Sequence, residues 1–402
     1  MKIKIQPSKL SGQVLAPPSK SFAHRMMICA ALADGESIIH GISESEDMLA
    51  TIDCIEAIGA HVRKIGNTVY ITGRTSKTPD GAILRCRESG STLRFMIPLS
   101  LNGERVRFEG TPRLLARGIG IYEDILGNKD ISIRKDETGI EFCGRLKAGE
   151  YILRGDVSSQ FVSGLMFALP LLDDDSVIRV LPPVESRAYI NITVAVLKSF
   201  GIEVCETEEN TFLVKGSQRY SAGEKTVEGD WSNTAALEAF NYIGGQVSVD
   251  GLNYDSIQGD KVCLKYLDSL RHKQDVLDLS NCPDLGPVLF AAAATIGRGA
   301  EFTGTKRLRI KESDRAAAMA QELEAFGIET ELYENSFIIK PGIIHTPTRL
   351  LSSHNDHRIV MALTLLCSLT GGIIDGAEAV RKSFPDYFET LRTIGLEAEY
   401  EA

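Results

Sequence analysis

The sequence predicts an α/β (α+β) fold in two similar domains, each built from about three repeats of helix–strand–helix–hairpin. At 402 residues the chain is too long for one ordinary hydrophobic core. Six nearly all-apolar helical segments follow polar clusters, and amphipathic helices that end at glycine recur before paired short strands. Internal repetition of this kind indicates stacked supersecondary units.

The all-apolar segments are the first repeated feature. They begin at Ser19, Glu88, Asp156, Asp230, Asp284 and Asn355. Consecutive starts lie 54 to 74 residues apart. A helix that is apolar on every face is a core helix. Their polar first residues cap the helices or leave backbone N–H donors free, so parallel helices would bring their positive ends to one anion-attracting face.

The second repeated feature is an amphipathic helix that ends at glycine and precedes two short strands. It occurs at 55–73, 197–216 and 323–342. The glycine suits a left-handed helix C-cap, and the paired apolar runs predict hairpins. A change of unit near Val227–Asp230 predicts the domain boundary.

Composition excludes several classes of protein. The chain is 43% apolar and 24% charged, as in globular proteins. No apolar run reaches the roughly 18 residues of a membrane span, and the charged start predicts a strand, not a signal or transit peptide. Eight scattered cysteines without C-x-x-C or a Cys/His cluster predict free thiols in a reducing cytosol and no structural zinc. A net charge of −10 disfavours a nucleic-acid partner.

Two helix starts in the first half of the chain carry anion-seeking groups. PPSKSFAHR places Lys20, Ser21 and Arg25 at a helix start, where capping with solvated charge is the alternative explanation. DVSSQF (156–161) places two serines and a glutamine at another helix N-terminus, a suitable seat for phosphate. Capping accounts for one of these serines, not for all three side chains.

IKESDR and NDHR provide the corresponding signals in the second half. Lys311 and Arg315 are four residues apart, so we expect them to share one helical face. Pairing with Glu312 and Asp314 is the ordinary explanation, and a bound anion with Glu312 as an acid/base is the functional one. NDHR (355–358) opens a buried helix with an arginine, which requires a partner or a cleft.

Other candidates are weak singly, because turns, capping, core packing or surface charge would explain each of them. They are Gly90, Arg117, Ser186, Tyr189, Asp284 and Lys382. Together the cations suit small ligands that carry phosphates and a carboxylate. Asp284 and Glu312 then remain for proton transfer.

PPSKSFAHR, ESGSTLR, DVSSQF, CPDLG, LRIKESDR, NDHR and KSFPDYF follow one another along the chain. In this order and spacing, the chain resembles the 5-enolpyruvylshikimate-3-phosphate synthase family of enolpyruvyl transferases from end to end. The resemblance implies two similar domains, each of three βαβαββ units, in an inverse α/β barrel with buried parallel helices. With the boundary above, we expect a discontinuous domain, 1–18 and 229–402, a continuous domain, 19–228, and an active site in the cleft between them.

The resemblance also implies a reaction. The enolpyruvyl group of phosphoenolpyruvate would pass to the 5-hydroxyl of shikimate 3-phosphate, with release of phosphate, by addition and elimination through a tetrahedral intermediate. This is a step of chorismate and aromatic amino acid biosynthesis. The family implies no metal or organic cofactor, no nucleic-acid or membrane partner, and a cytoplasmic monomer.

The family pattern assigns roles to matching positions. Asp284 would accept the 5-hydroxyl proton, and Glu312, with Lys20, His357 or Lys382, would move the proton at C3. Shikimate 3-phosphate would contact Lys20, Ser21, Arg25, Ser158, Ser159, Gln160, Ser186, Tyr189, Asp284 and Lys311. Phosphoenolpyruvate would contact Lys20, Gly90, Arg117, Gln160, Glu312, Arg315, Arg358 and Lys382.

Departures from the family pattern occur at Glu88, Ser91, Ala188, Asn191 and Arg307, and none removes a proposed proton carrier. Three alternative functions remain. A sister transferase acting on UDP-N-acetylglucosamine is disfavoured because the loop 111–118 lacks cysteine. An RNA 3′-phosphate cyclase is disfavoured by the acidic composition and the absence of its histidine motif. A non-catalytic anion-binding protein would be expected to lose Asp284 or Glu312.

Overall fold

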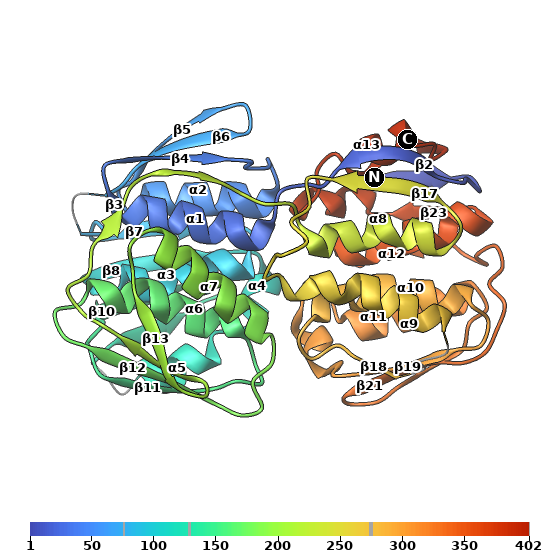
Figure 1. The fold of residues 1–402 in the computed structure, drawn as a ribbon. Coiled ribbons are helices and arrows are strands. Elements are labelled where there is room, and N and C mark those ends of the chain that lie inside the picture. The colour runs from blue at the N-terminus through green and yellow to red at the C-terminus, as the bar shows by residue number, and fades with distance from the viewer. Residues whose placement is uncertain (75–76, 128–129, 273–275, 402) are drawn as a thin grey trace. The chain divides into compact units, whose positions relative to one another are not determined.

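The computed structural model describes residues 1–74, 77–127, 130–272 and 276–401. The chain folds into a continuous unit, Pro18–Glu228, and a discontinuous unit formed by Met1–Pro17 and Gly229–Ala402. The α/β class predicted from the sequence is confirmed, because both units combine helices with mixed sheets (Figure 1). We describe each unit by itself.

The continuous unit contains three four-stranded sheets of one design, in which a parallel pair of strands lies beside an antiparallel hairpin. The first sheet has the order β16 (Glu224–Thr226), β4 (Glu36–His40), β6 (Thr68–Thr72), β5 (His61–Ile65). The second has the order β7 (Ala82–Arg85), β8 (Asn102–Glu109), β10 (Gly139–Arg145), β9 (Ser132–Lys135). The third has the order β11 (Glu150–Arg154), β12 (Ser176–Leu181), β14 (Thr211–Val214), β13 (Val204–Glu208). A short pair, β3 (Ala33–Asp34) and β15 (Tyr220–Ser221), completes the set.

Helices of two kinds fill the continuous unit inside these sheets (Figure 1). The buried apolar ones are α1 (Lys20–Leu32), α3 (Gly90–Ser100) and α6 (Ser159–Ala168). The others are α2 (Glu46–Ala57), α4 (Pro112–Ala116), α5 (Gly120–Leu126) and α7 (Arg187–Ser199), with the 3₁₀ turn η1 (Leu169–Leu171). Each buried helix follows a serine N-cap, as the polar clusters predicted.

The discontinuous unit repeats this plan with one shortened sheet. The first sheet has the order β22 (Leu351–Ser352), β23 (Gly372–Asp375), β1 (Lys2–Ile5), β24 (Ala398–Glu401). The second has the order β18 (Val276–Asp278), β19 (Ala300–Thr303), β21 (Ser336–Ile339), β20 (Thr330–Leu332). The third is the parallel pair β2 (Ser11–Leu15) and β17 (Gln246–Asp250).

The helices of the discontinuous unit follow the same division. The buried ones are α8 (Trp231–Tyr242), α10 (Gly286–Thr295) and α12 (His357–Thr370). The others are α9 (Cys263–Arg271), α11 (Arg315–Ala325) and α13 (Tyr387–Thr393). The 3₁₀ turns are η2 (Gly259–Val262), η3 (Pro283–Leu285), η4 (Lys306–Ile310) and η5 (Ala377–Lys382).

The shortened sheet departs from the regular repeat that the sequence predicted. Among the described residues, no strand lies between α9, which ends at Arg271, and β18, which begins at Val276. This explains why the helix starts at Asp230 and Asp284 are closer together than any other neighbouring pair.

Each unit has its own hydrophobic core. In the discontinuous unit, Phe290 of α10 stacks on Phe337 with ring centroids 4.3 Å apart and meets Phe302 edge-on. Apolar side chains on all faces of α10 are buried, as expected for a core helix. Among the described residues, none of the helices combines the length and hydrophobicity needed to cross a membrane.

A buried chain of hydrogen bonds joins α1, α2 and α3. Nδ1 of His24 lies 2.7 Å from Oγ1 of Thr51, which lies 2.8 Å from Oγ1 of Thr92. Thr92 donates to Oγ of Ser89 at 2.8 Å. These contacts are satisfied together when Nδ1 of His24 carries the proton and Thr51 passes its own hydrogen to Thr92. Nε2 of His24 is then a buried nitrogen that has no hydrogen-bond partner among the residues that the structure describes.

The surroundings keep the His24 ring neutral. Burial lowers the pKa of His24 well below its ordinary value of 6.5, and the positive charges of Lys20 and Arg25 lower it further. The folded protein therefore does not take up a proton here at a pH at which the unfolded chain does.

We predict that His24 makes the protein less stable as the pH falls below about 6.5. The unfolded state then binds one more proton than the folded state, so this group lowers the free energy of unfolding by up to about 1.4 kcal/mol per pH unit. Urea denaturation followed by circular dichroism, between about pH 7.5 and pH 5, measures this slope. His24→Gln should flatten it, whereas His61→Gln, at an exposed position of β5, should not. Equal slopes in wild type and His24→Gln would contradict the prediction.

Candidate functional site

The structure places the predicted site residues in two clusters, one in each unit. The continuous-unit cluster consists of Lys20, Ser21, Arg25, Gly90, Arg117, Ser158, Ser159, Gln160, Ser186 and Tyr189. The discontinuous-unit cluster consists of Asp284, Lys311, Glu312, Arg315, His357, Arg358 and Lys382. In both clusters, the residues come mainly from the starts of helices.

Helix starts supply the continuous-unit cluster with backbone donors as well as side chains. Lys20, Gly90 and Ser159 are the first residues of the three buried helices, and Ser186 is the N-cap of α7. The first N–H groups of a helix have no partner within it, and they carry its positive end. The positions therefore suit anionic ligands.

Arg25 ties several members of the continuous-unit cluster together. Its side chain is 3% exposed, and Nε donates to Oγ1 of Thr193 at 2.7 Å. Nη1 donates to the carbonyl of Ser21 at 2.8 Å, and Nη2 donates to the carbonyl of Tyr189 at 3.1 Å. Burial lowers the pKa of Arg25 to about 10, so the guanidinium stays charged at neutral pH. The structure thus brings Ser21, Arg25 and Tyr189 together.

Lys20 pairs with a residue that the sequence did not single out. Its Nζ lies 2.8 Å from Oδ2 of Asp47, in the first turn of α2, and both side chains are largely buried. Asp47 therefore holds the lysine near the start of α1. The only sequence signal for this contact is an acidic residue in the first turn of the next helix.

Gly90 and Arg117 lie in contact. A Cβ added at Gly90 would lie 3.0 Å from Nη2 and 3.1 Å from Cζ of Arg117. The absence of a side chain at Gly90 therefore allows the guanidinium to lie against the first turn of α3. Substituting any larger residue at Gly90 would push Arg117 away.

Gln160 is held by two residues of α3. Nη1 of Arg94 donates to Oε1 of Gln160 at 2.6 Å, and Nε2 of Gln160 donates to Oγ of Ser91 at 2.8 Å. Arg94 was not among the predicted residues, although an arginine within the apolar segment GSTLRFMIPLS was a visible signal. It is 4% exposed, and it also donates to the carbonyls of Arg117 and Gly118 at 3.4 Å. Arg94 therefore positions both Gln160 and the segment that carries Arg117.

The serines play different structural parts. Oγ of Ser158 accepts the N–H of Gln160 at 3.3 Å, which is the capping role. Ser159 is 5% exposed at the start of α6. Ser186 is 1% exposed and has a φ of 56°, a left-handed conformation that is uncommon for serine. Such outliers are found preferentially at functional sites.

Arg315 is the centre of the discontinuous-unit cluster. It is 1% exposed, and its guanidinium reaches three carboxylates. Nε donates to Asp356 at 2.8 Å, Nη1 donates to Asp284 at 2.6 Å, and Nη2 donates to Glu312 at 2.8 Å. Burial alone would lower the pKa of Arg315, but the carboxylates raise it above its usual value. One guanidinium therefore holds both predicted proton carriers, Asp284 and Glu312.

Asp284 is also paired with Lys311, whose Nζ lies 3.0 Å from the same Oδ1. Burial alone would raise the pKa of Asp284, but the positive charges of Lys311, Arg315 and Arg358 hold it well below its usual range. Burial lowers the pKa of Lys311, an effect that the charge of Asp284 opposes. The carboxylate is therefore ionised, as a proton acceptor must be, and its proton affinity is low while both cations contact it.

The predicted common helical face of Lys311 and Arg315 is wrong. Lys311 follows η4 with an extended backbone, and α11 begins only at Arg315. Asp314 sets this start, because its side chain accepts the N–H of Ala317 at 3.1 Å as an N-cap. The two cations meet through Asp284 instead, and Arg315 faces carboxylates of the protein.

Asp356 anchors the start of α12 and was predicted only as part of a capped helix start. It is fully buried, accepts from Oγ of Ser313 at 3.0 Å and caps the N–H of Arg358 at 2.9 Å. Arg358 is 5% exposed and donates to the carbonyl of Ser232 at 2.7 Å. His357 is buried beside Asp356, with Nδ1 3.8 Å from Oδ1.

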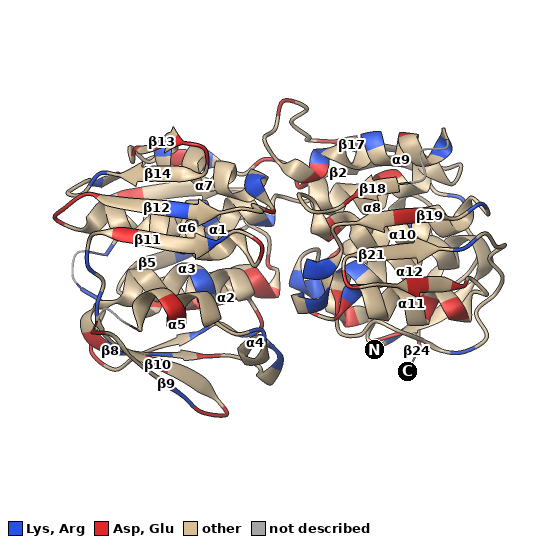
Figure 2. Ribbon diagram, turned by 90° about the horizontal axis from the view of Figure 1, so that it is seen from below, with Lys and Arg blue, Asp and Glu red and all other residues tan. Residues whose placement is uncertain are grey.

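Lys382, the last predicted member, lies at the end of η5 and donates to the carbonyl of Asn355. Figure 2 shows basic segments, in blue, gathered beside acidic ones within the discontinuous unit. In the described ranges of the chain, no three His, Cys, Asp or Glu side chains are placed to hold a metal ion. The cluster thus offers an ionised carboxylate at Asp284, a second carboxyl group at Glu312 and several cations, a set suited to moving protons beside anionic groups.

Known proteins resemble this chain over its whole length. The family model described as EPSP synthase (3-phosphoshikimate 1-carboxyvinyltransferase) matches residues 5–391. The 3-phosphoshikimate 1-carboxyvinyltransferase of Clostridium kluyveri is 39% identical and covers 99% of this chain and 98% of its own. The enzyme of that name from Clostridium acetobutylicum is also 39% identical, covering 98% of this chain and 97% of its own.

Solved structures support the fold independently. The structure of EPSP synthase from Acinetobacter baumannii matches with a TM-score of 0.81 and 22% sequence identity, covering all of both chains. At this identity the match supports the fold alone, whereas the family model and the clostridial relatives support membership. The chain belongs to the EPSP synthase (3-phosphoshikimate 1-carboxyvinyltransferase) family.

Proposed function

We propose that this chain is a 3-phosphoshikimate 1-carboxyvinyltransferase, which transfers the enolpyruvyl group of phosphoenolpyruvate to the 5-hydroxyl of shikimate 3-phosphate and releases phosphate. The contact of Arg315 with both Asp284 and Glu312 is the observation that carries the proposal. Addition and elimination at a vinyl group require one base for the hydroxyl and one acid/base for the terminal carbon. The discontinuous-unit cluster holds two such carboxyl groups, Asp284 and Glu312, on the same guanidinium.

Shikimate 3-phosphate would bind mainly to the continuous-unit cluster. Its phosphate fits the serine-rich starts of α6 and α7, where hydroxyls and backbone N–H groups lie together. Arg25 and Ser21 would hold its carboxylate, and Tyr189 would lie beside its ring. Lys311 of the discontinuous unit is the remaining residue that the family pattern assigns to this substrate.

Phosphoenolpyruvate would contact the remaining basic side chains of the two clusters. Arg117, held against Gly90, and Gln160, held by Arg94, would bind it from the continuous unit. Arg315, Arg358 and Lys382 would bind it from the discontinuous unit. These charges stabilise the negative charge on the leaving phosphate, and they act most strongly where water is excluded.

The proton steps follow from the two carboxylates. Asp284 takes the proton of the 5-hydroxyl as the hydroxyl oxygen attacks C2 of phosphoenolpyruvate. Glu312, with Lys20, His357 or Lys382, gives a proton to C3 of phosphoenolpyruvate. The tetrahedral intermediate then loses phosphate as the proton leaves C3 again. The phosphate of the substrate competes with Asp284 for Lys311. Because the contact between Lys311 and Asp284 is then weaker, the proton affinity of Asp284 rises.

We further infer that the enzyme acts in the cytoplasm as a monomer without a metal or organic cofactor. Support for the compartment comes from its eight cysteines, all of which are unpaired. Free thiols are typical of a reducing compartment.

The activity can be tested by measuring phosphate release from phosphoenolpyruvate with three acceptors and no added metal. We expect release with shikimate 3-phosphate and none with the other two acceptors. Shikimate lacks the phosphate that Ser158, Ser159 and Ser186 would hold, and the loop 111–118 lacks the cysteine of the sister transferase that acts on UDP-N-acetylglucosamine. Release with the nucleotide sugar alone would contradict the proposal. Folded protein that binds shikimate 3-phosphate but releases no phosphate would also contradict it.

Variants of the two carboxylates test their assigned roles. Asp284→Asn and Glu312→Gln should each lower kcat by about 10²–10⁴-fold, the usual contribution of a positioned acid or base. Both keep the size of the side chain, so calorimetry should show nearly unchanged affinity for shikimate 3-phosphate. Asp268→Asn, an exposed carboxylate of α9, is the matched control and should keep full activity. Near-normal turnover in either test variant would remove that residue from the mechanism.

A further inference from the structure

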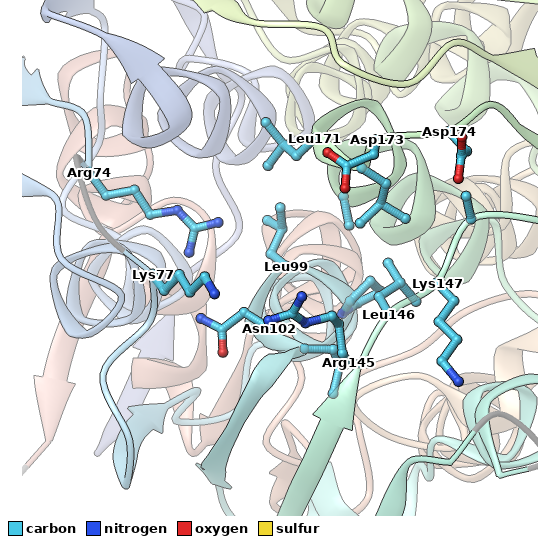
Figure 3. Close-up of a pocket in the computed structure, with 15 residues that line it drawn as sticks. Arg74, Lys77, Leu99, Asn102, Arg145, Leu146, Lys147, Leu171, Asp173 and Asp174 are labelled. Atoms are coloured by element: carbon cyan, nitrogen blue, oxygen red, sulfur yellow. The ribbon is translucent and has the colours of Figure 1, made fainter.

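A pocket lies in the continuous unit, away from the candidate site. It has a volume of about 540 Å³ and is lined by residues at the C-terminal ends of α3 and α6, the end of β10 and the segment after β6 (Figure 3). This volume is within the range of about 300–1,000 Å³ that small-molecule sites occupy. Gly90 lies at the opposite end of α3, roughly 15 Å away at 1.5 Å per residue.

Three cations of this pocket have no acidic partner. Arg74, Lys77 and Arg145 form no ion pair within 4.0 Å among the described residues. Only Arg74 has a side-chain hydrogen bond there, from Nη1 to Oγ1 of Thr78 at 3.0 Å. Figure 3 shows these three side chains converging beside Asn102. Lys77 and Arg145 are exposed and Arg74 is partly buried, so all three are accessible to an anion that enters the pocket.

The pocket also has an apolar floor and an acidic rim. Leu99 and Leu146 are buried beneath it, and Leu171 remains 38% exposed at its edge. Asp173 and Asp174 lie beyond Leu171 as seen in Figure 3, and neither carboxylate pairs with a cation among the described residues. Basic and acidic side chains without an ion-pair partner among the described residues therefore border the apolar surface formed by the leucines.

We propose that this pocket binds a free α-amino acid with a bulky apolar side chain. The carboxylate would face Arg74, Lys77 and Arg145, the ammonium group would face Asp173 and Asp174, and the side chain would cover the leucines. A dianion would meet the two aspartates as well as the cations, and a simple amine would leave the three cations without a counter-charge. A zwitterion with an apolar body matches all three parts of the lining.

The test compares L-phenylalanine with two truncated probes, using isothermal titration calorimetry on the full chain. 3-Phenylpropionate lacks the ammonium group, and phenethylamine lacks the carboxylate. We expect saturable binding of L-phenylalanine and at least about tenfold weaker binding of each probe, since each one leaves a set of charges unpaired. Absence of saturable L-phenylalanine binding, or equal binding of all three compounds, would overturn the proposal.

Variants locate the binding. Arg145→Gln should weaken L-phenylalanine binding about tenfold or more, whereas Arg105→Gln, an exposed arginine of β8 outside the pocket, should not. Asp173→Asn with Asp174→Asn should remove the preference for L-phenylalanine over 3-phenylpropionate. Unchanged affinity in Arg145→Gln would overturn the assignment. Phosphate release from phosphoenolpyruvate should persist in all these variants, which separates this test from that of the proposed function.

Discussion

The buried contact of Arg315 with three carboxylates is the constraint on which the discontinuous unit depends. Removing one guanidinium and three carboxylates from water is costly, and the attraction between them offsets that cost only when every group is paired. Here each nitrogen of Arg315 reaches a carboxylate. Lys311 and Arg358 add the two positive charges that balance the other two carboxylates. Losing one partner would therefore leave a buried charge unpaired.

This interaction joins the starts of three helices. Asp284 precedes α10, Arg315 opens α11, and Asp356 caps α12. The acidic side chains of Asp284 and Asp356 also suit the positive ends of α10 and α12, which favour negative charge. The fold thus brings acidic groups together on core helices, whose rigid packing fixes the distances between them.

The continuous unit uses the same architecture with neutral caps. Ser19, Ser89 and Ser158 precede its buried helices, where the discontinuous unit has Asp230 and Asp356 before α8 and α12. A serine cap leaves the positive end of the helix uncompensated, which suits the binding of anions. An aspartate cap compensates the positive end of the helix and adds a carboxyl group there. One repeated scaffold therefore carries neutral caps on the buried helices of one unit and acidic caps on two buried helices of the other.

Local patterns predicted the helices well and the contacts between them poorly. All-apolar runs identified the core helices because burial on every face leaves no polar stripe. The strands β16 and β1 complete sheets with segments distant in the chain, and no local pattern marks that pairing. Asp47 and Arg94 were missed because their partners, Lys20 and Gln160, lie on other helices. The helical face expected for Lys311 failed because a single cap at Asp314 moved the helix start.

The most direct test of this account is the titration of the Asp284 carboxyl by ¹³C NMR, assigned through the loss of its signal in Asp284→Asn. Clamping by Lys311 and Arg315 predicts that the carboxylate stays ionised in the ligand-free protein down to about pH 4 and below. In Lys311→Met, the midpoint should move to higher pH because burial then opposes the charge with one cation fewer. A wild-type midpoint at or above about 4, unchanged in Lys311→Met, would contradict the central role given to this ion cluster.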